Sequence, residues 1–244
     1  MIAGDTMQKA VVAIALVVAN TTACRHTIQG VRTEFVGSYA FTPSERRAIA
    51  KIAGDAAREA RPHLPALAPQ ITLRVRSGTD VIPELGATAE VAPPAFIMWT
   101  VDPARPEGVV TIAETHLRGA LFHEFHHLVR GATIQPRTLM DHVVSEGLAT
   151  AFERDVAGTS RPWGQYPADV SSWVDELLRL PEPSMQERDE WLRGHRNGRR
   201  WVGMRAGTYL ADVAMKRLNK SAADLVLAST TEILNAAGFG AGAP

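Results

Sequence analysis

The chain has 244 residues, of which 45% are apolar and 21% are charged, so it can bury the core of one large domain or two small lobes. Its formal net charge is zero, which excludes a global field that recruits nucleic acid or an anionic membrane. The single cysteine, Cys24, excludes an internal disulfide and a cysteine-ligated zinc site. Any metal site must therefore use histidine and carboxylate side chains.

Residues 1–24 are typical of a bacterial export signal. The apolar run Ala10–Ala19 follows Lys9 and is too short to span a bilayer, but it suits the central region of a signal peptide. Two processing routes stay open: a small-x-small cleavage site at Thr21 and Ala23, or a lipoprotein signal in which a lipidated Cys24 attaches the protein to a membrane. We expect a periplasmic or membrane-anchored protein, with secretion as the alternative location. A buried apolar N-terminal helix is the other interpretation of this segment.

The next part of the chain predicts one helix and a small sheet. Thr42, Pro43 and Glu45 form the capping pattern of a helix that runs to about Arg61. Residues 81–94 are rich in glycine, proline and alanine, and we expect a loop there. Strands are expected within Thr33–Phe41 and at Ile71–Arg76, Ala95–Val101 and Val109–Ala113.

A helix from Glu114 to Arg130 carries the pattern H-E-x-x-H at His123, Glu124 and His127. Residues four apart lie on one helix face, so the two imidazoles can bind one ion, and Glu124 can reach a water molecule on that ion. Two ligands with an adjacent general base are the arrangement of a zinc hydrolase. A shuffled chain of this composition contains the pattern roughly 0.02 times, so the rest of the chain must support the assignment.

Two further histidines near this pattern are not expected to bind the ion. His126 lies off the ligand face and is expected to pack in the interior or beside the site. His116 lies nearly two turns upstream, which is too far to bind the same ion.

A catalytic zinc ion has three protein ligands, and the next helix, Thr138–Ala157, offers the third. Glu146 is the best candidate because it lies among apolar residues, and the glycine that follows it, Gly147, is expected to let the two helices approach closely at the metal. Glu153 and Asp141 on the same helix are competing candidates for the third ligand. His142, one turn before Glu146, is a candidate to lie beside the ligands or the substrate.

The pattern around His123, together with Ser145-Glu146-Gly147-Leu148-Ala149, resembles the gluzincin class of zinc metallopeptidases. It is most similar to a bacterial family of predicted Zn-dependent proteases with an H-E-x-H-H motif and a downstream E-G-L-A. The resemblance implies one Zn²⁺, ligands His123, His127 and Glu146, and hydrolysis of a peptide or protein substrate. It also implies a Tyr or His donor to the oxyanion on a C-terminal helix. Tyr209 is similar in placement, and His195 is the alternative.

We therefore expect an α+β, zincin-like fold: a small mixed or antiparallel sheet packed on the motif helix in residues 25–131, then a mainly helical lobe in residues 132–237 and a tail at 238–244. Helices are expected at Ala168–Leu180, Ser184–Arg193, Trp201–Leu218 and from Ser221 to about Ala237, with a basic loop at residues 193–200.

The predicted function is an exported zinc metallopeptidase. An edge of the strand Ala95–Val101 is expected to pair with an extended substrate. The alternatives are a zinc amidase acting on a small or cell-wall substrate, and a zinc-binding lipoprotein without activity.

Overall fold

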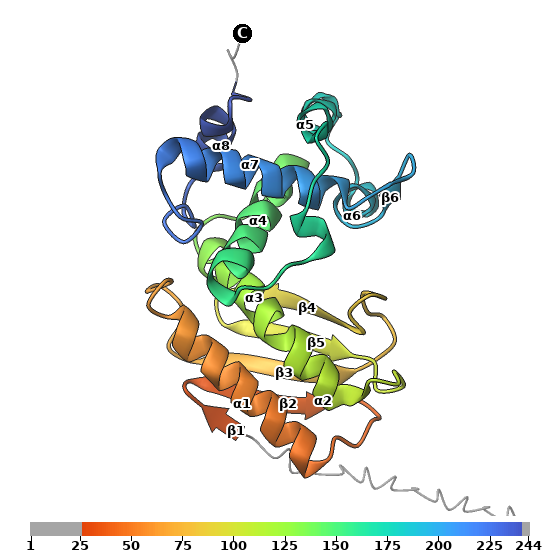
Figure 1. Cartoon of the computed structure of the whole chain (residues 1–244). Coiled ribbons are helices and arrows are strands. Elements are labelled where there is room, and N and C mark those ends of the chain that lie inside the picture. Colours follow the sequence, from red (N-terminus) through yellow and green to blue (C-terminus); the bar gives the residue numbers. More distant parts are fainter. Residues whose placement is uncertain (1–25, 241–244) are drawn as a thin grey trace, which may run out of the picture.

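The computed structural model describes residues 26–240, except for the side chains of His26, His195 and Arg196. A sheet with one layer of two helices against it occupies one half of the molecule, and the other half is helical (Figure 1). The expected export signal and residues 241–244 of the expected tail lie outside the described residues.

Five strands form a mixed sheet in the order β1-β2-β3-β5-β4. The three central strands are parallel to one another, whereas β1 and β4 run antiparallel to their neighbours at the two edges. In β3, burial alternates with period two, so Ile71, Leu73 and Val75 face the core. The strands are β1 (His26–Ile28), β2 (Val31–Val36), β3 (Ile71–Ser77), β4 (Ala87–Ala92) and β5 (Phe96–Val101).

Two helices lie side by side against one face of this sheet (Figure 1). The first, α1 (Pro43–Ala60), begins with the expected capping box between Thr42 and Glu45. The second is continuous through α2 (Gly108–Ile112), the π-helical turn η1 (Ala113–Leu117) and α3 (Arg118–Gly131). This second helix carries the H-E-x-x-H pattern and lies between the sheet and the helical half.

The helical half packs on α3 and shares one continuous apolar core with the sheet half. The expected α+β architecture is thus confirmed. No helix within residues 26–240 is both long and apolar enough to cross a membrane. The elements are α4 (Leu139–Phe152), the π-helical turn η2 (Glu153–Ala157), the 3₁₀ turn η3 (Pro162–Gly164), α5 (Val170–Arg179), α6 (Met185–Leu192), the hairpin β6 (His195–Arg196) and β7 (Arg199–Arg200), α7 (Val202–Leu218) and α8 (Thr230–Ala237).

Two expectations for residues 81–113 are wrong. The expected loop 81–94 contains β4, whose small residues hide a strand that pairs with all of β5. The expected strand Val109–Ala113 is helical, because Val109 and Ile112 are spaced to bury one helix face. The motif helix therefore begins six residues before the expected Glu114.

Three boundaries also differ from expectation. The strand expected within Thr33–Phe41 is β2, which begins at Val31 and ends at Val36. Residues 193–200 contain the hairpin β6–β7 and not only a loop. Ser221 and Asp224 cap a turn, while the final helix starts at Thr230 behind its own capping box.

Gly147 serves a different contact from the one expected. A methyl group at Gly147 would overlap the backbone of Gly207 on α7, and a methyl group at Gly207 would overlap the carbonyl of Val143 on α4. The close approach is therefore between α4 and α7, and not between α4 and the motif helix. Because Gly147 directly follows Glu146, this crossing fixes the turn of α4 that carries Glu146.

We predict that Gly147→Ala lowers the free energy of unfolding by about 3 kcal/mol or more, because two backbones in contact cannot separate without repacking α7. Urea denaturation followed by circular dichroism measures this loss. Gly164→Ala is the matched control, since its new methyl group would meet only the Thr150 side chain, at 3.3 Å. Equal losses in the two variants would contradict the role of the crossing.

Candidate metal centre

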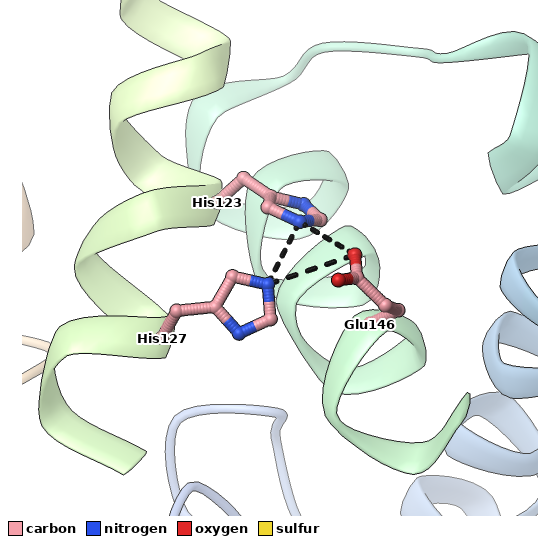
Figure 2. Close-up of side chains that lie close together, drawn as sticks. All are labelled: His123, His127 and Glu146. Carbon is pink, nitrogen blue, oxygen red and sulfur yellow. Dashed lines mark hydrogen bonds and ion pairs between the residues drawn. The ribbon is translucent and has the colours of Figure 1, made fainter. Parts of the chain in front are cut away.

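Three side chains from α3 and α4 converge on one point (Figure 2). The Nε2 atoms of His123 and His127 lie 3.0 Å apart, because four residues on α3 bring the two rings to one face. The Oε2 atom of Glu146 lies 3.1 Å from His123 Nε2 and 3.6 Å from His127 Nε2. The structure thus brings the three expected ligands together.

The spacing of these atoms suits a single zinc ion. Ligands that bind zinc tetrahedrally at about 2.0–2.1 Å are separated from one another by about 3.4 Å. The three observed separations, 3.0, 3.1 and 3.6 Å, lie close to this value. Two imidazole nitrogens and a carboxylate oxygen are also donors that zinc prefers. The residues therefore fit the ion.

The outer nitrogens of both imidazoles face polar partners, which orients the Nε2 atoms toward each other. Ser145 Oγ lies 3.2 Å from His127 Nδ1. Glu153 Oε2 lies 3.6 Å from His123 Nδ1, which is an ion-pair distance and not a hydrogen bond. Such partners hold a ligating imidazole in place and increase its basicity.

Glu153 is itself held by a buried ion pair. Its side chain is 1% exposed, and Arg161 Nε donates to its Oε1 at 2.6 Å. Arg161 also donates to the His116 carbonyl at 3.1 Å, so the guanidinium connects η1, η2 and the following loop. Room for the carboxylate comes from Gly119 on α3, where a methyl group would collide with Glu153.

The electrostatics of the centre favour positive charge. Burial alone would lower the pKa of His123, but the carboxylates of Glu146 and Glu153 raise it to about 10. Burial likewise opposes ionisation of Glu146, yet the two histidines keep its pKa well below the usual range. A group of buried carboxylates that stabilises a proton on His123 will also stabilise a metal cation.

Glu124 lies in the same cavity without joining the three converging atoms. Its side chain is buried and lines the cavity beside His123 and His127. Burial raises the pKa of Glu124, although the two histidines partly offset this. A carboxylate with a raised pKa accepts a proton readily and can release it again near neutral pH.

The cavity has a volume of about 810 Å³ and runs along α3 and β4. Residues Thr88–Val91 of β4 form part of its wall, so the sheet edge beside the metal centre is β4 and not the expected Ala95–Val101. Arg193, at the end of α6, lines the cavity as well. Desolvation would lower the pKa of Arg193, but Glu146, Asp189 and Glu124 raise it. Its Nε also donates to Asp189 Oδ1 at 3.0 Å.

Other candidates lie apart from the converging atoms. Asp141 closes the capping box of α4 and accepts from Thr230. His142 lines the cavity with Nε2 3.3 Å from Arg188, and His126 is fully buried with Nε2 3.3 Å from the Ala222 carbonyl. His116 faces Arg161.

The structure does not bring Tyr209 to the metal centre. Its ring packs at 5.5 Å from Tyr166 and 6.3 Å from Phe239, on a part of α7 that does not line the cavity. His195 pairs with Arg200 through the backbone of β6, but its side chain lies outside the described part of the structure.

The sequence alone did not single out Ser145, Gly119, Arg161 or Arg193 for these contacts. Glu153 was considered only as a competing ligand. Its spacing of seven residues from Glu146, which returns to one helix face, is the signal that places it near the same histidine.

Comparison with models of known protein families gives a match over most of the chain. A sequence model of the family described as "Predicted Zn-dependent protease (DUF2268)" matches residues 50–235, which is more than half of the chain. No curated protein matches the chain significantly.

We predict that Glu153→Gln weakens zinc binding by about 10- to 100-fold, because His123 loses the carboxylate that orients it. Competition with a chromophoric chelator measures the affinity. Glu107→Gln, which removes an exposed partner of Arg105, serves as the control and should leave zinc affinity unchanged. An unchanged affinity in Glu153→Gln would show that Glu153 has no part in the site.

The buried side chain of His126 is expected to make the stability of the fold sensitive to acid. Burial holds its pKa well below 6.5, so below about pH 6.5 the unfolded chain binds a proton that the folded chain does not. Stability is therefore lost as the pH falls through this range.

In metal-free protein, His126→Leu should reduce the dependence of the unfolding free energy on pH, between about pH 6.5 and 5, by up to about 1.4 kcal/mol per pH unit. Urea titrations at several pH values measure the slope. His63→Leu removes an exposed histidine and should leave the slope unchanged. Identical slopes in wild type and His126→Leu would refute the assignment.

Proposed function

Because the chain belongs to the family of predicted Zn-dependent proteases, we propose that it is a zinc metallopeptidase with one Zn²⁺ held by His123, His127 and Glu146. The observation that carries this proposal is the convergence of two imidazole nitrogens and a carboxylate oxygen beside a fourth residue, Glu124, that is left free for chemistry. Three protein ligands leave a position for water, which distinguishes a catalytic from a structural zinc site.

A zinc ion bound there would supply a Lewis acid that acidifies a water molecule and polarises the scissile carbonyl. Glu124 accepts the proton of the attacking water and returns it to the leaving amine. Its raised pKa suits both steps. A carboxylate with a low pKa is too weak a base to accept the water proton, and a group with a very high pKa is too weak an acid to return it to the amine.

Arg193 is the candidate for the oxyanion role that the resemblance implied for Tyr209, with His195 as the alternative. It is a cation on the cavity wall whose charge acts on Glu124 and Glu146. A positive group on the cavity wall stabilises negative charge that develops on the carbonyl oxygen, and Asp189 holds the guanidinium there through an ion pair at 3.0 Å.

The edge of β4 binds the substrate backbone. An extended peptide that adds to this edge lies along the cavity wall, and its scissile bond can reach the metal centre. Peptides are therefore favoured over small amides, which cannot use the strand edge.

Export remains part of the proposal and rests on the sequence alone. The apolar run Ala10–Ala19 and the segment up to Cys24 support a periplasmic or membrane-anchored location.

We predict that Glu124→Gln keeps zinc but lowers peptide hydrolysis by about 10³-fold, because it removes the general base and spares the ligands. Elemental analysis after gel filtration measures zinc, and a fluorogenic peptide mixture measures turnover. Glu114→Gln, which neutralises an exposed glutamate outside the cavity, should retain both. Full turnover in Glu124→Gln would disprove the mechanism, and its loss of zinc would disprove the ligand assignment.

A further inference from the structure

His142 lines the cavity, but one edge of its ring contacts a cation that does not. Its Nε2 atom lies 3.3 Å from Nη1 of Arg188, and Arg188 is not part of the cavity wall. Burial and the positive charge of Arg188 lower the pKa of His142, so the ring is neutral near neutral pH. Because a guanidinium can only donate, Nε2 accepts this hydrogen bond and the single ring proton lies on Nδ1.

Two further contacts hold Arg188 in place beside His142. Its Nη2 donates to Glu182 Oε1 at 2.9 Å. The Glu182 carboxylate in turn accepts from the backbone N–H of Leu139, the first residue of α4, at 2.9 and 3.2 Å. His142 lies three residues further along the same helix, so these contacts form a closed ring that fixes the imidazole.

The position of His142 relative to the metal centre follows from the direction of the two helices. Ser145 faces His127, whereas Glu153, which follows later in the chain, faces His123, so α3 and α4 run antiparallel. His142 precedes Ser145 by three residues, or about one helical turn. It therefore lies beyond His127, toward the C-terminal end of α3.

His142 also lies in the half of the molecule that does not contain β4, and both line the cavity (Figure 1). An extended peptide directs its backbone groups alternately to its two edges, so a peptide paired with β4 turns other carbonyls away from that strand. These carbonyls need donors from the helical half. No group in the described part of the chain is hydrogen-bonded to His142 Nδ1, so its proton is free for such a carbonyl.

We propose that the Nδ1–H group of His142 donates a hydrogen bond to a backbone carbonyl of the bound peptide, and that Arg188 positions the proton on this nitrogen. The inference rests on the proposed peptidase function, but the binding that it predicts does not require turnover.

Nitrogen-15 NMR of the zinc-loaded protein tests the position of the proton, because the protonated and bare nitrogens of a neutral imidazole have well-separated shifts. The resonances of His142 are those lost in His142→Asn. Near neutral pH, Nδ1 should carry the proton. In Arg188→Met the proton is no longer confined to Nδ1, so the two shifts should move toward each other. A proton on Nε2 in the wild type would overturn the proposal.

Two substitutions separate contact with the substrate from packing. The amide nitrogen of His142→Asn can replace the Nδ1 donor, whereas the amide of His142→Gln reaches the Nε2 position and keeps only the contact with Arg188. Both are made in zinc-loaded Glu124→Gln, and binding of Ac-Ala-Ala-Ala-Ala-Ala-Ala-NH₂ is measured by isothermal titration calorimetry. Alanine side chains suffice because the proposed bond is to the peptide backbone.

His142→Asn should bind this peptide within about twofold of the parent protein, and His142→Gln about five- to tenfold more weakly. A residue that only packs against Arg188 would give the opposite order, since His142→Gln preserves that contact. Equal affinities in the two variants, or tighter binding by His142→Gln, would overturn the proposal.

Hydrolysis by the wild-type protein separates this inference from the proposed function. If the two variants differ as expected but the wild type cleaves no peptide, the peptidase function fails while the role of His142 stands. If the wild type cleaves peptides but the variants bind equally, only the role of His142 fails. Absence of any peptide binding by the parent protein would overturn both.

Discussion

Two glycines, Gly147 on α4 and Gly207 on α7, let the backbones of these helices touch. The crossing holds α4 in register against the helical half, and α3 packs against the same helix from the other side. Glu146 precedes Gly147 by one residue, so its carboxylate meets the two imidazoles of α3 only while this crossing is intact. The metal centre therefore depends on a contact that contains no ligand.

A second constraint on the structure is the negative charge that is buried around His123. Glu124, Glu146 and Glu153 all lie close to His123, and burial opposes the ionisation of Glu124 and Glu146. Arg161 neutralises Glu153, and Arg193 acts on the other two from the cavity wall. A metal cation between His123, His127 and Glu146 would complete this balance, so the arrangement suits the binding of an ion and not only packing.

The sequence predicted the parts of the fold and the site that depend on local spacing. The H-E-x-x-H turn and the capped start at Thr42 follow from local helical spacing, and Glu146 was chosen for its apolar neighbours on the next helix. It could not predict β4, because Ala87–Ala92 becomes a strand only by pairing with β5. The resemblance suggested Tyr209 as the oxyanion donor, but its ring packs against Tyr166 and Phe239. Contacts that form only in the folded protein, such as that of Arg161 with Glu153, cannot be predicted from the sequence around either residue.

The central claim is that one zinc ion is held by three protein side chains while Glu124 stays free. Diffraction from zinc-soaked crystals, collected on both sides of the zinc absorption edge, tests it most directly. The account predicts one anomalous peak about 2.0–2.3 Å from His123 Nε2, His127 Nε2 and a Glu146 oxygen. A peak coordinated by Glu124, Glu153 or Asp141 in place of Glu146, or no peak at these residues, would contradict it.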